Sequence, residues 1–147
     1  MNALANTQLL TRHTHRTGPE LKLMEEITLP QARAHEVCGN ARHLFALMVA
    51  KALSGHVFWI TPSWQAETLN PEGMLALVDP SRFTFVSVRR PDDILWSLEE
   101  VLRSGSVPLV VAEMPEPPAM TPVRRLHLAA ESGAKDGRVP PMGLLLT

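Results

Sequence analysis

HEVCGNARHLFAL, at residues 35–47, is the stretch that decides the fold of this chain. It predicts a short strand over Ala34–Cys38, a tight turn at Gly39, and a helix over Ala41–Leu53 with apolar residues at helical spacing. A strand that passes through a glycine turn directly into a helix is the setting in which many proteins bind nucleotide phosphates. The next question is whether the chain keeps the residues that hold phosphate.

Those residues are absent. The phosphate-binding loop has the pattern G-x-x-x-x-G-K-[ST], in which the second glycine lets backbone amides surround the phosphate, the lysine contacts the terminal phosphates, and the hydroxyl binds magnesium. Here Gly39 is followed by Asn40, Ala41 and Arg42, and the helix begins at once. Arg42 or His43 could still contact an anion at the helix N-terminus. We therefore interpret Gly39, Asn40 and Arg42 as part of a degenerate nucleotide site.

Outward from this stretch, strands and helices alternate. The predicted strands are the apolar runs 56–60, 82–88, 107–112 and 142–146, and the predicted helices are 71–78, 91–104 and 121–132. Strands separated by helices favour parallel pairing with right-handed crossovers. The predicted fold class is therefore α/β, a three-layer sandwich around a mostly parallel sheet. Trp59 and Trp96 lie within apolar periods and are expected in the core.

Composition limits the class of protein. The 147 residues fit one domain, predicted over residues 23–147 after a flexible N-terminal tail at 1–22. The formal net charge of −1 argues against a generally basic surface, so direct nucleic-acid binding is expected to be weak. Cys38 is the only cysteine, which excludes an internal disulfide and predicts a buried thiol in a reducing compartment. No apolar run reaches the ~20 residues that cross a bilayer, so we expect a cytoplasmic protein without membrane contact.

Partner sites in a parallel sheet lie at the carboxyl ends of the strands. Trp64 follows Pro62-Ser63 in a loop at this edge, and an exposed tryptophan commonly anchors a protein interface. The alternative is that Trp64 packs locally over the sheet. Glu116-Pro117, in the proline-rich loop after the strand at 107–112, is a second candidate docking segment, although such a loop often only separates two elements.

Two arginine pairs, Arg89-Arg90 and Arg124-Arg125, are further partner-binding candidates. They could form a basic patch for DNA phosphate or for an acidic partner. Alternatively, they are solvated ends of elements that Asp92, Asp93 or Glu131 neutralises. The exposed edges of so short a sheet also allow self-pairing into a homodimer, or addition of a partner's strand.

A resemblance to known proteins is carried by residues 98–113, LEEVLRSGSVPLVVAE. This segment resembles the helix, Ser-Gly turn and Walker B strand of the RecA recombinase core, and the likeness extends from about Ile27 to Leu146. Within this superfamily the chain is similar to the ImuA-type accessory proteins of damage-induced mutagenesis, and it also resembles SulA, a division inhibitor without a working phosphate loop. The fragments that carry the ImuA likeness are Leu29-Pro30, His35-Glu36-Val37, Trp59-Ile60, Leu98-Glu99-Glu100, Arg103-Ser104-Gly105, Val110-Val111-Ala112-Glu113, Arg124-Arg125-Leu126 and Leu128-Ala129-Ala130.

The resemblance places Glu113 where a Walker B aspartate would lie, as the fourth residue of the degenerate nucleotide site. A carboxylate there holds magnesium only through a nucleotide that the phosphate loop must first bind. The likeness also implies a truncated RecA-like core, because RecA continues into further strands and DNA-binding loops.

The implied function is a non-catalytic protein-interaction module in the bacterial DNA-damage (SOS) response, an accessory of error-prone translesion synthesis. Its partner would be the translesion polymerase assembly or RecA. One alternative is a SulA-like inhibitor that binds the cell-division GTPase, and another is a degenerate NTPase completed by a partner's residues. We expect no enzymatic activity, no cofactor and no metal site.

Overall fold

The computed structural model describes residues 18–147, so the expected flexible tail at 1–22 lies largely outside this part. Within it, β1 (Glu20–Lys22) pairs antiparallel with β2 (Thr28–Pro30). The expectation of a tail up to residue 22 is therefore corrected for β1. The physical reason is burial, because Leu21 belongs to the hydrophobic core and Leu29 packs against the same cluster.

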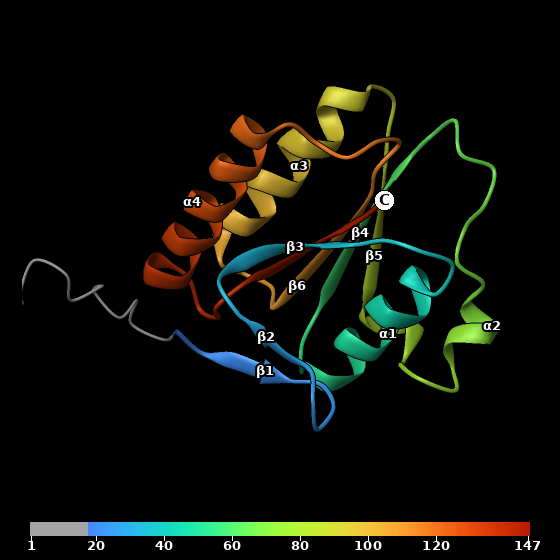
Figure 1. Ribbon diagram of the computed structural model, residues 1–147. Coiled ribbons are helices and arrows are strands. Elements are labelled where there is room, and N and C mark those ends of the chain that lie inside the picture. Colours follow the sequence, from blue (N-terminus) through green and yellow to red (C-terminus); the bar gives the residue numbers. More distant parts are fainter. Residues whose placement is uncertain (1–17) are drawn as a thin grey trace, which may run out of the picture.

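Five strands form one all-parallel sheet (Figure 1). They are β3 (Arg33–Val37), β4 (Val57–Pro62), β5 (Phe83–Val88), β6 (Leu109–Glu113) and β7 (Met142–Leu146). Their order across the sheet is β3-β7-β6-β4-β5, which leaves β3 and β5 at the two edges. β4 runs further than the apolar run at 56–60, because Thr61 and Pro62 continue the register opposite Ser87 and Val88.

Helices cover both faces of this sheet and confirm the predicted three-layer α/β sandwich (Figure 1). α1 (Arg42–Ala52) lies on one face, where the short α2 (Pro71–Met74) contributes Met74 to the same core cluster. α3 (Pro91–Ser104) and α4 (Met120–Asp136) pack side by side on the other face. Within residues 18–147, no helix combines the length and the apolar character that spanning a membrane requires.

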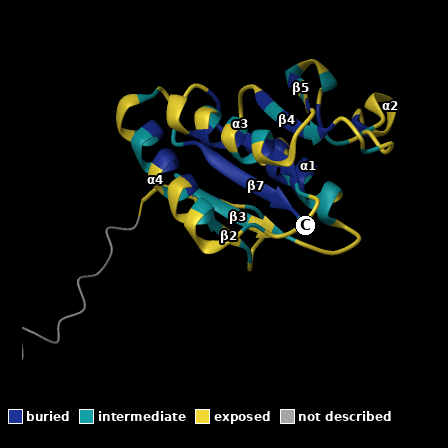
Figure 2. Cartoon of the chain, turned by 90° about the horizontal axis from the view of Figure 1, so that it is seen from above, coloured by how far each residue is buried: buried dark blue, intermediate teal, exposed yellow. Residues whose placement is uncertain are grey.

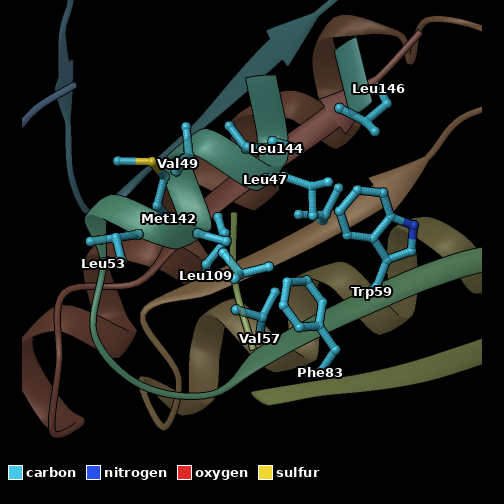
Figure 3. Packing of buried hydrophobic residues seen from close by; sticks show 14 of the residues in the cluster. Leu47, Val49, Leu53, Val57, Trp59, Phe83, Leu109, Met142, Leu144 and Leu146 are labelled. Carbon is cyan, nitrogen blue, oxygen red and sulfur yellow. The ribbon is translucent and has the colours of Figure 1, made fainter. Parts of the chain in front are cut away.

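The core divides into two clusters, one on each face of the sheet. Figure 3 shows the first, in which Leu47 of α1 packs over Trp59 of β4 and Leu144 of β7. The second lies under α3 and α4, and β7 between the two layers is buried along its whole length (Figure 2). Trp59 is fully buried, as expected.

Trp96 contradicts the expectation of a core residue, because 62% of it is exposed. It lies two residues after Ile94 and two before Leu98, both of which are fully buried. Two residues turn an α-helix by about 200°, so Trp96 must point away from the stripe that faces the sheet.

α4 continues to Asp136, although the sequence predicts that this helix ends near Ser132. Gly133 is buried inside α4, where a Cβ atom would lie 2.0 Å from the Leu102 carbonyl oxygen of α3. Gly105 meets it from the end of α3 with a left-handed φ of 56°. The glycines let the two helices approach through their backbones, and this contact keeps the last turn of α4 in place.

Candidate functional site

The Gly39 turn joins β3 to α1 and is closed by the chain's own arginine. Gly39 has φ 100°, a left-handed conformation that favours glycine. The Arg42 guanidinium donates from Nη1 to the Gly39 carbonyl oxygen over 3.0 Å, and the Arg42 backbone N–H donates to the same oxygen over 3.3 Å. Arg42 thus holds the turn and the first residue of α1 together. Cys38 beside it is exposed, contrary to the expected buried thiol, because it lies one residue past the end of β3.

Glu113 ends β6 and is nearly fully buried. Trp59 donates from Nε1 to its Oε1 over 2.8 Å, and the Gln65 side-chain amide donates to its Oε2. His43 places Nε2 3.5 Å from Oε2, and its ring stacks on Trp59 with centroids 6.2 Å apart. The carboxylate is therefore engaged from α1, from β4 and from the following loop. We call the Gly39 turn, Arg42 and the four residues of this network the closed corner.

The closed corner fills the crevice that this fold offers for a ligand. β4 and β6 are neighbours, yet the chain leaves β4 toward the α1 face and leaves β6 toward α4 on the opposite face. Such a switch point is where parallel sheets usually bind small molecules. Here the space beside His43 and Glu113 is a cavity of about 130 Å³, well below the roughly 300 Å³ at which ligand sites begin. Among residues 18–147, no group of His, Cys, Asp and Glu could hold a metal ion.

A second region, near the carboxyl ends of β4 and β5, contains a larger cavity. The loop after β4 is tied to β5 because the Ser63 N–H donates to the Val88 carbonyl oxygen over 2.8 Å. It overhangs a cavity of about 520 Å³, within the size range of ligand and side-chain pockets. The lining carries no charged residue and consists of Trp59, Thr61, Pro62, Ser63, Gln65, Thr68, Leu69, Pro71, Phe85 and Ser87.

Two exposed aromatic residues belong to the segments that form this cavity: Phe85 lines it, and Trp64 lies between the lining residues Ser63 and Gln65. Trp64 is 51% exposed, and Phe85 on β5 is 47% exposed while its ring stacks on Phe83. We call the cavity, Trp64 and Phe85 the open rim. The exposure of Trp64 matches what a partner-binding residue requires, whereas Phe85 was not singled out by the sequence. Its signal was the alternation within β5, which places Phe83 and Phe85 on one face.

The remaining candidates lie around the start of α3. Glu116 and Pro117 are exposed and line a small cavity with Pro91 and Asp92. Arg125 lies on α4, and its guanidinium contacts the Glu99 carboxylate of α3 over 2.8 Å. Glu99, and not Asp92, Asp93 or Glu131, is thus the acid that neutralises Arg125.

The other three arginines of the pairs, Arg89, Arg90 and Arg124, are exposed. Arg89 and Arg90 follow β5, and Arg124 lies on α4. A shared basic patch formed by the two pairs stays a prediction, as do the roles of Glu116 and Pro117.

Sequence also missed the partners of Glu113. His43 and Gln65 come from α1 and from the loop after β4, far from Glu113 along the chain. His43 was expected only to contact an anion at the helix N-terminus, and nothing in the local pattern around Gln65 indicates a role. Only the neighbouring positions of β4 and β6 in the sheet bring Gln65 and Trp59 to the end of β6.

Comparison with known proteins finds a similarity of fold. No protein-family model matches the chain, and no curated protein matches it. Among solved structures, the chain is similar to SulA from Pseudomonas aeruginosa, with a TM-score of 0.59 and 19% sequence identity. The match covers 80% of this chain and 100% of the SulA chain. The two proteins therefore share a fold, and the ImuA-type assignment stays a prediction.

Proposed function

We propose that this chain is a non-catalytic protein-binding module of the bacterial DNA-damage response, which binds the cell-division GTPase and inhibits division as SulA does. The observation that carries the proposal is that Trp59 and Gln65 donate hydrogen bonds to the two oxygens of the Glu113 carboxylate at the switch point of the sheet. The common fold with SulA, over the whole length of that chain, supports this alternative over the translesion accessory role.

The same geometry supports the proposal that the chain carries out no nucleotide chemistry. Phosphoryl transfer depends on charged groups that clamp the phosphates, and those groups must be free to reach them. In the closed corner the only arginine folds back onto its own turn, and the acid that would reach magnesium is buried against Trp59. The four residues that follow Gly39 in sequence, 40–43, include no lysine and no hydroxyl.

A thermal-shift titration tests the non-catalytic part. A ligand that binds only the folded state stabilises it by RT ln(1 + L/Kd), where L is the free ligand concentration, so the melting temperature rises with the logarithm of ligand concentration above Kd. We expect no shift with ATP or ADP, with or without magnesium. A concentration-dependent rise with either nucleotide would overturn this part and favour a degenerate NTPase.

Recognition is assigned to the open rim. Trp64 presents a large aromatic side chain from a turn whose flanking residues are held by the hydrogen bonds from Ser63 to Val88 and from Gln65 to Pro62, so little backbone entropy is lost on binding. The cavity that its neighbours Ser63 and Gln65 line is uncharged and has more apolar than polar surface, which suits an apolar side chain from the partner.

Polymerisation of the purified division GTPase, followed by light scattering, tests the partner. We expect the protein to inhibit polymerisation, and Trp64→Ala to raise the inhibitory concentration by about tenfold or more. Trp96→Ala is the matched control, because it removes an equally large exposed ring from the opposite layer and should leave inhibition unchanged. No inhibition by the wild type, together with capture of a translesion polymerase or RecA from damaged cells, would favour the ImuA-type role instead.

A further inference from the structure

A groove follows the first half of α3, between this helix and the chain that leads from β6 into α4. Two small cavities form it. The larger, of about 230 Å³, is lined by Trp96 and Arg125, and the smaller, of about 160 Å³, is lined by the proline-rich loop that carries Glu116. Asp92 and Leu95 line both cavities, which places the two next to each other along α3. We call this surface the α3 groove.

The larger cavity of the α3 groove is mainly apolar. Leu126 is almost fully buried and Leu95 is partly buried, so they form its floor, whereas 62% of Trp96 is exposed. A helical side chain leans toward the N-terminus of its helix, so the indole of Trp96 extends toward Asp92, which lies one turn earlier. An exposed tryptophan beside a cavity is typical of a residue that anchors an interface.

The unpaired charges of the α3 groove are negative. Among residues 18–147, Arg125 is the only cation that lines either cavity, and it forms an ion pair with Glu99 over 2.8 Å. Asp92 and Glu116 are exposed, and neither forms an ion pair within the same part of the chain. The arginine pair at 89–90 precedes α3 and lines neither cavity. An aromatic face and two free carboxylates both attract a cation.

Only one of these two carboxylates has a role in forming the helix. Asp92 lies in the first turn of α3, where a negative charge interacts favourably with the helix dipole. Glu116 lies in the loop after β6, outside every helix of residues 18–147, and has no such role. The negative charge at this end of the α3 groove is therefore more than the stability of α3 requires.

We propose that the α3 groove binds a segment of a second protein partner in which an arginine or lysine lies next to a large apolar side chain. The cation lies over the Trp96 indole and faces the carboxylates of Asp92 and Glu116, while the apolar side chain packs on Leu95 and Leu126. Tryptophan is the best aromatic partner for a cation. The α3 groove shares no lining residue with the cavity of the open rim, so it is a separate recognition surface.

Selection from a random-peptide phage library on the immobilised full chain tests this inference. The library is first passed over Trp96→Ala, which removes phage that bind elsewhere on the protein. We expect the peptides that the wild type then retains to share a lysine or arginine next to a large aliphatic or aromatic residue. No enrichment, or enrichment of peptides without a cation, would overturn the proposal.

Fluorescence polarisation with the most enriched peptide, labelled with fluorescein, then measures Kd. Trp96→Ala should raise Kd by about tenfold or more. The double variant Asp92→Asn with Glu116→Gln keeps the shapes of both side chains and removes their charges, so Kd should rise about three- to tenfold and depend less on NaCl concentration. Trp64→Ala is the matched control and should bind the peptide like the wild type.

Three results of these titrations would overturn the proposal. The first is an unchanged Kd in the charge-neutral double variant, and the second is loss of peptide binding in Trp64→Ala. The third is self-association of labelled wild type that Trp96→Ala abolishes, which would make a second copy the occupant. None of them depends on the division GTPase, whose inhibition is expected to need Trp64 and not Trp96.

Discussion

The closed corner and the open rim share two residues, Trp59 and Gln65, but their side chains have opposite environments. In the closed corner the polar groups satisfy one another, and no buried side-chain nitrogen or oxygen among residues 18–147 lacks a hydrogen-bond partner. In the open rim, apolar rings remain in solvent beside an uncharged cavity. Groups that chemistry would need are used for structure, whereas groups suited to recognition are left accessible.

The largest effect is expected where the closed corner is cut at its centre. Glu113→Ala removes the acceptor of Trp59 Nε1 and Gln65 and leaves a buried donor unpaired, so we expect a loss of about 2 to 4 kcal/mol in the free energy of unfolding. Urea denaturation followed by tryptophan fluorescence measures it. Glu116→Ala, in the exposed loop that follows, is the control and should change stability by less than about 0.5 kcal/mol.

A smaller loss of unfolding free energy in Glu113→Ala, or none, would contradict this view of the closed corner. It would mean that burying the Glu113 carboxylate lowers stability, as expected of a group kept for binding. The thermal-shift titration with nucleotides would then be repeated on the wild type at higher ligand concentration.

A matched pair of tryptophan substitutions sharpens the comparison. Trp59→Phe removes the indole N–H that Glu113 accepts and leaves a small cavity in the core, so a loss of about 1 to 3 kcal/mol is expected. Trp64→Phe, the same change at an exposed position, should stay within about 0.5 kcal/mol of the wild type. Equal losses in the two variants, measured by urea denaturation, would show that Trp64 is a packing residue and would remove the basis of the open rim.

Much of the fold was predictable because it depends on local patterns. The apolar run at 142–146 coincides with β7, and Pro91-Asp92 with Ser104-Gly105 marks both ends of α3. These signals are set by burial period and by the backbone limits of proline and glycine. Trp96 shows how such reasoning fails, because an apolar residue within a helix was assigned to the core without its angle around the axis being considered.

The closed corner was only half predictable for a different reason. Gly39 and Glu113 follow from strand ends, but Trp59 and Gln65 reach Glu113 across 54 and 48 residues of sequence. That meeting depends on the order of strands, β6 beside β4, which the period of a single segment does not encode. The open edge at β5 has the same origin, since a strand is an edge only by its place in the sheet.

The smallest effect concerns β3, the strand that leads into the closed corner and that polar groups hold against α4. The Ala34 N–H donates to His127 Nδ1 over 3.4 Å, and Arg33 pairs with Glu131. Burial, followed by the positive charge of Arg33, holds the pKa of His127 below its ordinary value of 6.5. The hydrogen bond from Arg33 lowers the pKa of Glu131 below 4.5.

Acidification should therefore weaken this attachment in two steps. Below about pH 6.5 the unfolded chain protonates His127 before the folded chain does, and below about pH 4.5 the same holds for Glu131, so stability falls with pH in both ranges. In His127→Asn, whose side-chain oxygen keeps the acceptor, urea midpoints between about pH 7 and pH 5 should decline less steeply than in the wild type. An identical decline in the two proteins would show that the acid sensitivity between these pH values arises elsewhere and that His127 does not anchor β3.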